Sequence, residues 1–407
     1  MTHPTSALQT LWNRLCRVAP ALPALAATAV LVACGGGGGS TATPPTATAT
    51  TVFASGPITG FGSVIVNGVR FDDSGATMDD EDGGSLAESQ LRLGMQVDVD
   101  GDGDKDDATH GRAHALHVHS ALVGPVGAVD TAAGTLTVLG QTVTANAQTV
   151  FDTAIAGGLA GIASGAVVRV HGQFDSASQS YLATRIELAP AANHFKIRGT
   201  ITALDATART LQIGATAIDF STTANVPTTL AVGSLIVARL ATTPVNGVWT
   251  ATAIGDGHRA MHDHDEAHLR GVISDFTSVT QFSVDGNPVD ATNARFPDGQ
   301  AGVVLGASVE VEGQLVAGVV VARVVGLEDE SHHDGQRVEL HGKIGALDTT
   351  AQTFVVRGVT VSYAGSVEFD HGSAAALAND LFVEVKGGLS ADGTTVAATR
   401  IDLQPKD

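Results

Sequence analysis

The residues best suited to bind an ion form an acidic run between positions 98 and 107. Four aspartates alternate there with Val and Gly: Asp98, Asp100, Asp102 and Asp104. With Gly103, the first three match positions one, three, five and six of a calcium loop, where alternate carboxylates converge on a hard cation. The acid expected at position twelve is missing, because Thr109 stands there. An outward-facing acidic hairpin explains the same pattern, so both interpretations stay open.

A second group of candidate ligands is a His-rich segment at residues 256–268. Its four histidines have acidic neighbours and are His258, His262, His264 and His268. Imidazole is a suitable ligand for zinc, nickel or copper. The alternative is a polar linker that happens to be rich in His. Two more histidines, His117 and His119, alternate with Val118 and would share one strand face, either as half a metal site or as ordinary exposed residues.

The start of the chain predicts export and lipidation. Residues 1–33 contain two arginines and then an apolar stretch that is short and interrupted by proline, which is typical of a secretory signal. The tetrapeptide Leu31–Cys34 resembles the bacterial lipobox, whose cysteine carries diacylglycerol. We therefore predict a lipid anchor on Cys34 and a disordered, Gly- and Thr/Ala/Pro-rich tether over residues 34–55. The resemblance implies an outer-membrane lipoprotein, facing the periplasm or the cell surface.

Composition and missing motifs exclude several functions. The formal net charge is −20, and losing the signal's two arginines brings it to about −22, so nucleic acid is not an expected partner. No nucleotide-binding loop, nucleophile elbow or His-Glu-x-x-His motif occurs, and the mature chain has no free thiol. We therefore expect no enzymatic activity and no cofactor, apart from Ca or Zn/Ni/Cu if the ion sites exist.

The elements that position these residues come from a fivefold repeat. A Gly followed two residues later by Ile or Val recurs at Gly56, Gly124, Gly199, Gly271 and Gly342, spaced by 68, 75, 72 and 71 residues. We call these five the signature glycines. Repeats of this kind indicate one structural unit per copy.

The sequence of each copy predicts five or six short strands. An alternating apolar strand is followed by a hairpin with turns such as Asn67-Gly68 and Asp285-Gly286, which tolerate positive φ. A Gly-x-x-Val-x-Val-x-Gly block comes next, as at residues 94–101, and then a strand of the Ala-Thr-Arg-Ile type, as at residues 183–186. We predict an all-β fold of five tandem OB-like barrels, because closure removes exposed strand edges. Small β-sandwiches are the alternative.

With these motifs, the chain resembles proteobacterial lipoproteins made of tandem copies of a β-barrel-like domain of unknown function. The resemblance extends from Gly56 to Leu403 and is weakest in the third copy. It implies a location and a fold, and no catalytic residues. The predicted copies span residues 56–121, 122–190, 195–255, 268–327 and 338–404, with polar linkers at 256–267 and 328–337.

Three functional hypotheses follow. The first is a non-catalytic envelope lipoprotein, anchored in the membrane by its lipid, that acts as a binding or structural module for an unknown envelope or extracellular ligand. The second is a divalent-metal binder that uses the acidic hairpin and the His-rich linkers. The third is an envelope enzyme with an unrecognised site.

Overall fold

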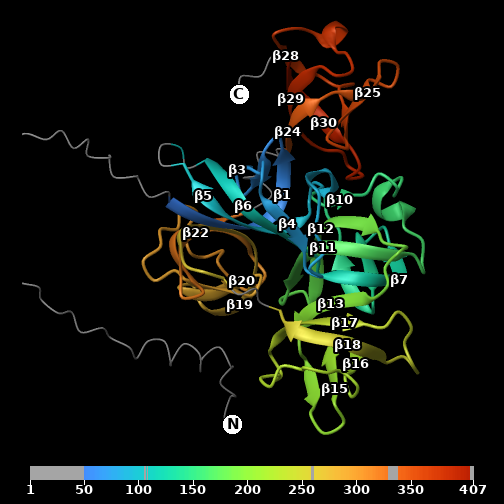
Figure 1. The fold of residues 1–407 in the computed structure, drawn as a ribbon, viewed down its shortest axis with the longest axis vertical. Coiled ribbons are helices and arrows are strands. Elements are labelled where there is room, and N and C mark those ends of the chain that lie inside the picture. The colour runs from blue at the N-terminus through green and yellow to red at the C-terminus, as the bar shows by residue number, and fades with distance from the viewer. Residues whose placement is uncertain (1–49, 105–106, 108, 258–260, 329–337, 404–407) are drawn as a thin grey trace, which may run out of the picture. The chain divides into compact units, whose positions relative to one another are not determined.

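The computed structural model describes residues 50–104, 107, 109–257, 261–328 and 338–403 (Figure 1). The predicted signal peptide, Cys34 and most of the predicted tether lie outside the described residues, as do His258 and most of the second linker. Three short 3₁₀ turns and no α-helix occur in the described ranges. No helix in this part of the chain is long or apolar enough to cross a membrane.

The first two copies have the same order of elements. Copy one contains β1 (Thr50–Phe61), β2 (Val64–Val66), β3 (Val69–Asp72), β4 (Thr77–Asp80), η1 (Glu88–Gln90), β5 (Gln96–Gly103) and β6 (His110–His119). Copy two contains β7 (Leu122–Asp130), β8 (Thr135–Val138), β9 (Gln141–Thr144), β10 (Val150–Phe151), η2 (Gly158–Gly161), β11 (Val167–Asp175) and β12 (Ser180–Leu188).

The later copies vary this order slightly. Copy three contains β13 (Phe195–Thr200), β14 (Ala203–Asp205), β15 (Thr210–Ile213), β16 (Thr216–Asp219), β17 (Leu235–Leu240) and β18 (Trp249–Asp256). Copy four contains β19 (His264–Ser278), β20 (Gln281–Val284), β21 (Asn287–Asp290), β22 (Ser308–Val316) and β23 (Val319–Leu327). Copy five contains β24 (Val338–Lys343), β25 (Gly345–Asp348), β26 (Thr353–Val356), β27 (Val359–Ser362), β28 (Glu368–Asp370), η3 (Ala374–Ala376), β29 (Phe382–Leu389) and β30 (Val396–Asp402).

Each copy closes into a five-stranded barrel. In copy two, β7 pairs with β8, β8 with β9, β9 in parallel with β12, β12 with β11, and β11 again with β7. Copies one and four close in the same order. In copies three and five the first barrel strand is split into two segments. The prediction of an all-β chain of small barrels is therefore confirmed.

The signature glycines hold equivalent places in all five barrels. Four of them lie opposite a fully buried valine of the fourth barrel strand, in the pairs Gly56–Val97, Gly124–Val168, Gly271–Val309 and Gly342–Val383. In copy three, Gly199 lies opposite Ile236. A Cβ on Gly124 would lie 2.5 Å from Cγ of Leu139, at the tip of the next hairpin. The glycine thus lets that hairpin pack closely over the first strand.

Three predicted boundaries need correction. β1 begins at Thr50, so residues 50–55 belong to a strand and not to the tether. β19 begins at His264, so the last third of the predicted His-rich linker is also strand. β5 runs to Gly103, so Asp102 lies within a strand and not in a loop. In each case a neighbouring copy or strand supplies the pairing that a polar local sequence does not predict.

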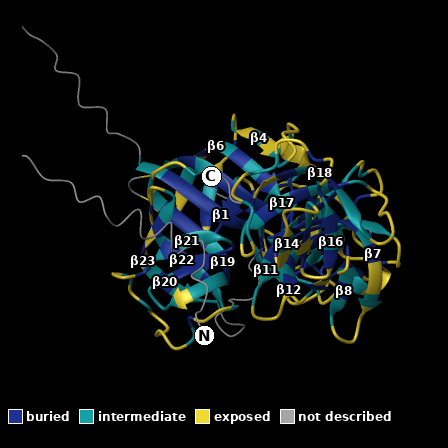
Figure 2. Cartoon of the chain, turned by 90° about the horizontal axis from the view of Figure 1, so that it is seen from below, coloured by how far each residue is buried: buried dark blue, intermediate teal, exposed yellow. Residues whose placement is uncertain are grey.

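The copies also pair with one another through their first strands. The first half of β1 pairs in parallel with β19 and its end pairs in parallel with β24, while β7 pairs with β13. The buried apolar side chains form three clusters and not five: copies one and five share one, and copies two and three share another. Phe53 of β1 belongs to the cluster of copy four. Figure 2 shows β1 buried along most of its length and exposed residues gathered at hairpin tips.

Candidate binding cavity between the copies

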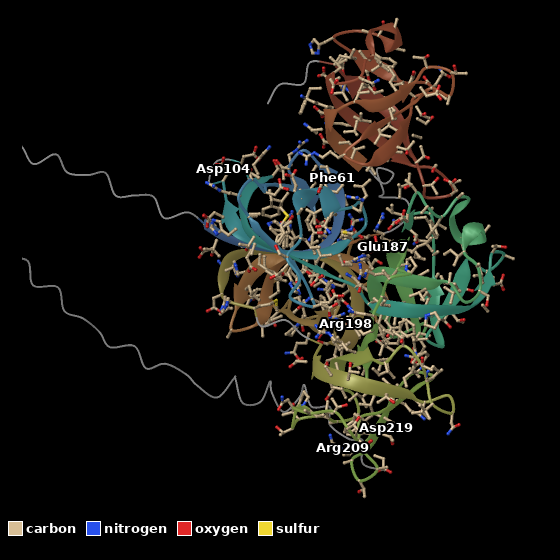
Figure 3. The ribbon with its side chains drawn as sticks, turned by 45° about the vertical axis from the view of Figure 1, so that its right-hand side comes forward. Phe61, Asp104, Glu187, Arg198, Arg209 and Asp219 are labelled. Atoms are coloured by element: carbon tan, nitrogen blue, oxygen red, sulfur yellow. The ribbon has the colours of Figure 1, made fainter. Side chains whose placement is uncertain are left out.

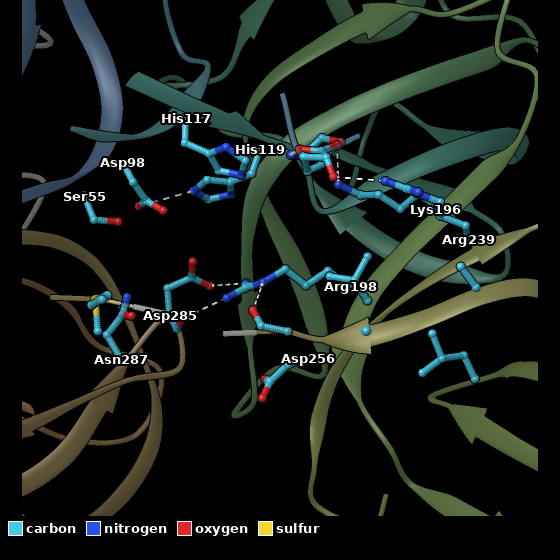
Figure 4. A pocket seen from close by; sticks show the side chains of 18 residues that line it. Ser55, Asp98, His117, His119, Lys196, Arg198, Arg239, Asp256, Asp285 and Asn287 are labelled. Carbon is cyan, nitrogen blue, oxygen red and sulfur yellow. Dashed lines mark hydrogen bonds and ion pairs between the residues drawn. The ribbon is translucent and has the colours of Figure 1, made fainter. Parts of the chain in front are cut away.

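A cavity of about 360 Å³ lies where copies one, three and four meet (Figure 4). Copy one contributes β1, β5 and β6, copy three contributes β13, β17 and β18, and copy four contributes the β20–β21 hairpin. Its wall carries four carboxylates, from Glu81, Asp98, Asp256 and Asp285, together with Lys196, Arg198, Arg239, His117 and His119. We call it the junction cavity.

Lys196 and Glu81 form a buried ion pair on one side of the junction cavity. Lys196 Nζ lies 2.5 Å from Glu81 Oε1, and the side chain of Lys196 is 2% exposed. Glu81 also accepts hydrogen bonds from the backbone N–H and the hydroxyl of Ser120. Burial alone would raise the pKa of Glu81, but Lys196, together with His119 and Ser120, outweighs burial and lowers this pKa to about 2. Glu81 is therefore ionised at neutral pH.

Arg198 links copy three to copy four across the same cavity. Its Nη1 donates to Asp285 Oδ1 at 2.8 Å, its Nη2 donates to the Asp285 carbonyl at 3.0 Å, and its Nε donates to the Gly257 carbonyl at 3.0 Å. Burial alone would lower the pKa of Arg198, but the nearby carboxylate of Asp285 raises this pKa overall. Asp285 is the first turn residue of the β20–β21 hairpin, with φ of 46°. Figure 3 shows Arg198 where these copies approach each other.

The wall formed by copy one brings together predicted residues from two patches. Asp98 is 8% exposed, and its Oδ1 lies 3.7 Å from His119 Nε2. His117 lies on the same face of β6 as His119, and its Nδ1 pairs with Asp79 on β4. Asp98 and the two histidines therefore share one cavity, although each histidine has a carboxylate of its own.

The predicted calcium loop does not form around Asp98, Asp100 and Asp102. These residues alternate along the continuous strand β5, where four residues span about 13 Å, too far for one ion. Each carboxylate faces a different histidine: Asp98 faces His119, Asp100 faces His264 at 3.3 Å, and Asp102 faces His114 at 3.1 Å. Asp104 lies just beyond the strand, where its N–H donates to the carbonyl of His110.

The described residues of the His-rich segment also separate. His264 Nδ1 donates to the His262 carbonyl at 2.8 Å, and its ring lies 5.8 Å from that of Phe53. His268 is buried farther along β19, and its Nε2 is 3.9 Å from Glu266. His262 is exposed, and His258 lies outside the described residues. The extended backbone of β19 keeps His264 and His268 from meeting as they would on a helical turn.

Within the described part of the chain, one group has the spacing of a metal site: Glu339, His341 and Glu384. Two cations already neutralise it. Arg70 pairs with Glu339 and approaches His341 Nε2 at 3.1 Å, while Lys386 Nζ lies 3.0 Å from Glu384. Burial favours the neutral form of Glu339, yet hydrogen bonding and Arg70 hold its pKa well below the usual range. A metal ion would have to displace both cations.

Sequence reasoning did not single out Lys196, Arg198 and Glu339, which join the copies, although a signal exists. These three residues occupy positions one or three before the signature glycine, as does His341, which contacts Arg70 of copy one. His268 and Arg270 occupy the same positions in copy four, but their side chains pair with Glu266 and Glu328 of copy four and its linker. These are outer-face positions of the first barrel strand. Charged residues at both positions of a strand otherwise built of apolar residues indicate a polar outer face, and the pattern alone does not distinguish a solvated face from one that pairs with another copy.

The basic side chains of the junction cavity are neutralised by carboxylates. Lys196, Arg198 and Arg239 each contact a carboxylate from another copy, Arg239 through Nη2 at 2.6 Å from Asp82. Such pairs position the barrels, because a buried cation without its partner is costly.

Comparisons with known proteins agree with this repeat architecture. A family model described as "Domain of unknown function (DUF5666)" matches residues 123–187, 270–326 and 341–402. These segments are copies two, four and five, and together they cover less than half of the chain. The chain thus carries three segments similar to one uncharacterised domain, repeated in tandem.

Other comparisons add little. No curated protein matches the chain. A solved structure titled "drosophila Unr CSD456" aligns with 52% of this chain and 98% of its own, at 11% identity and a TM-score of 0.14. A score this low supports no inference about this protein.

Proposed function

We propose that the protein is a lipid-anchored cell-envelope scaffold, in which docked barrels form a non-catalytic binding and structural module. The observation that carries this proposal is the set of ion pairs between copies, above all Lys196–Glu81 and Arg198–Asp285. In each pair, both groups serve to hold neighbouring barrels. A module that presents a ligand surface benefits from such rigidity, because less order is lost on binding.

The anchor part of the proposal rests on Leu31–Cys34 and is tested by fractionation. The full-length chain and Cys34→Ala are expressed in a bacterium that processes lipoproteins. We expect the unaltered chain to partition with outer membranes and the variant to leave them. Membrane retention of the variant to the same extent would refute the lipid anchor.

The scaffold part is tested by scattering from the full chain in solution. Docked barrels predict a radius of gyration that is unchanged by moderate salt, because the pairs that hold them are buried. A marked expansion of the chain between low and high salt would show that the barrels are only loosely tethered.

One observation favours a second candidate function, the binding of zinc, nickel or copper. Asp100 of the acidic run faces His264 of the His-rich segment at 3.3 Å, so the two predicted metal patches meet at this pair. Calorimetric titration with each ion tests this function. A dissociation constant above the millimolar range for all three ions would rule it out, and loss of binding in Asp100→Asn with His264→Ala would support it.

A further inference from the structure

A second cavity, of about 440 Å³, lies between copies one, two, four and five. One part of its wall is aliphatic and includes Ile58, Leu93 and Leu389. The other part carries charged groups from β3, β19, β22 and β24. Its volume is in the range of sites that enclose small organic molecules. It is separate from the junction cavity and shares none of its lining residues.

The charged groups of this wall are paired with one exception. Arg270 Nε lies 2.5 Å from Glu328 Oε1, and Arg70 is paired with Glu339. Glu310 stands opposite Arg270 in the register of β19 and β22, but the guanidinium of Arg270 is directed to Glu328. Among the described residues, no hydrogen bond or ion pair reaches the Glu310 carboxyl.

The surroundings of Glu310 make its charge costly. It is partly buried, and Glu328 and Glu312 are near enough to repel it, while Arg270 attracts it. Burial, with the charge of Glu328, raises the pKa of Glu310 to about 7. The cavity therefore holds one carboxyl more than its cations can balance.

We propose that this cavity binds a small organic cation, an amine whose ammonium group pairs with Glu310 while its apolar body lies against the aliphatic wall. An anion is disfavoured, because Arg70 and Arg270 already have carboxylate partners. A bare metal ion is disfavoured too, because Glu310 is not part of any three-ligand group in the described chain. The inference goes beyond the scaffold role and does not depend on the lipid anchor.

The test uses benzylamine as the probe and benzyl alcohol as its neutral counterpart. Both are titrated by calorimetry at pH 8 into the full chain, into Glu310→Gln and into Glu312→Gln. Glu312 is the matched control, because it is on the same strand but does not line the cavity. Gln at position 310 removes an unpaired charge, so this variant is expected to fold.

We expect the unaltered chain to bind benzylamine at least about tenfold more tightly than benzyl alcohol. Glu310→Gln should lose this preference and Glu312→Gln should keep it. The proposal is overturned if the two compounds bind equally, if Glu310→Gln keeps the preference, or if neither compound binds below about 10 mM.

Discussion

Lys196 of copy three and Glu81 of copy one, which are 115 positions apart in the sequence, meet in a buried ion pair at 2.5 Å. Lys196 comes from the strand that begins copy three, and Glu81 follows β4 of copy one. The pair belongs to neither barrel's own core. The stability lost when this ion pair is removed therefore reports how strongly copies one and three are docked to each other.

Removing this lysine should destabilise the protein strongly. Lys196→Met leaves Glu81 as a buried carboxylate without its partner, and we expect a loss of about 3–5 kcal/mol in unfolding free energy. Lys386→Met is the control, because Lys386 also pairs with a glutamate but its side chain is 46% exposed. We expect less than about 1 kcal/mol there. Denaturant unfolding followed by circular dichroism compares the two.

The double variant separates the pair from its surroundings. Lys196→Met combined with Glu81→Leu removes both charges and should recover most of the stability lost in the single variant. If Lys196→Met costs no more than Lys386→Met, the pair does not hold the copies together.

Glu310 should make the protein less stable as pH rises. Its folded pKa of about 7 is above its ordinary value, so the folded state holds a proton that the unfolded state has lost. The destabilisation therefore develops from about pH 4.5, the ordinary pKa of the glutamate, to about pH 7 and is complete above the folded pKa. Glu310→Gln should be more stable than the unaltered chain at pH 8, by about 1–3 kcal/mol, and equal to it near pH 4.

Thermal unfolding at several pH values checks this prediction, with Glu368→Gln, which changes an exposed carboxyl on β28, as control. A stability difference between Glu310→Gln and the unaltered chain that does not change with pH would contradict it.

Much of each barrel could be predicted from local sequence. Apolar alternation indicates which strand face enters the barrel, and the turn pairs Asn67-Gly68 and Asp285-Gly286 have positive φ at both residues, as their types suggest. The valines of the fourth block, such as Val97 and Val309, are buried in equivalent places. These features depend on neighbours within one copy, which is why one sequence pattern is enough to predict them.

The contacts between copies could not be predicted in the same way. The pairing of Asp100 with His264 depends on β1 lying between β5 and β19. A local pattern indicates that a face is polar, but it does not show which distant strand will cover that face. Consequently a local pattern indicates candidate ligands one patch at a time, and it does not indicate that they pair with different partners.

His171 should lower stability in acid. Its Nδ1 donates to the carbonyl of His119 at 2.7 Å, while its Nε2 is buried and lies 3.8 Å from Glu187, beyond hydrogen-bond reach. Burial lowers the pKa of His171 below its ordinary value, although Glu187 opposes this effect. The unfolded state therefore takes up a proton first, and stability is lost as pH falls below about 6.5.

The His171 effect is measured as the fall in melting temperature between pH 7 and pH 5. His171→Gln can still donate to His119 and cannot titrate, so this fall should be smaller than in the unaltered chain. His371→Gln, which changes an exposed histidine, should leave it unchanged. An equal fall in all three proteins would show that His171 is not responsible.

The second glycine of the fourth block should resist any side chain, because it lies at a β-bulge. The register of β5 and β6 shifts between Asp100 and Gly101, and a Cβ on Gly101 would lie 2.2 Å from the carbonyl oxygen of Arg112. The equivalent Gly172, Gly313 and Gly387 meet a carbonyl oxygen at 2.2–2.3 Å. Gly101→Ala must therefore separate the two strands, and we expect a loss of about 1–3 kcal/mol.

Gly255→Ala is the matched control for this prediction. Gly255 is also in a strand, and nothing lies within 4 Å of a Cβ built there. Its replacement should change stability by less than about 1 kcal/mol, because it alters mainly the entropy of the unfolded chain. Copy three has Leu240 at the bulge position, so its strands already admit a side chain there. If Gly101→Ala and Gly255→Ala are equally stable, the bulge in copy one also admits a side chain. The recurrence of glycine at this position would then need another explanation.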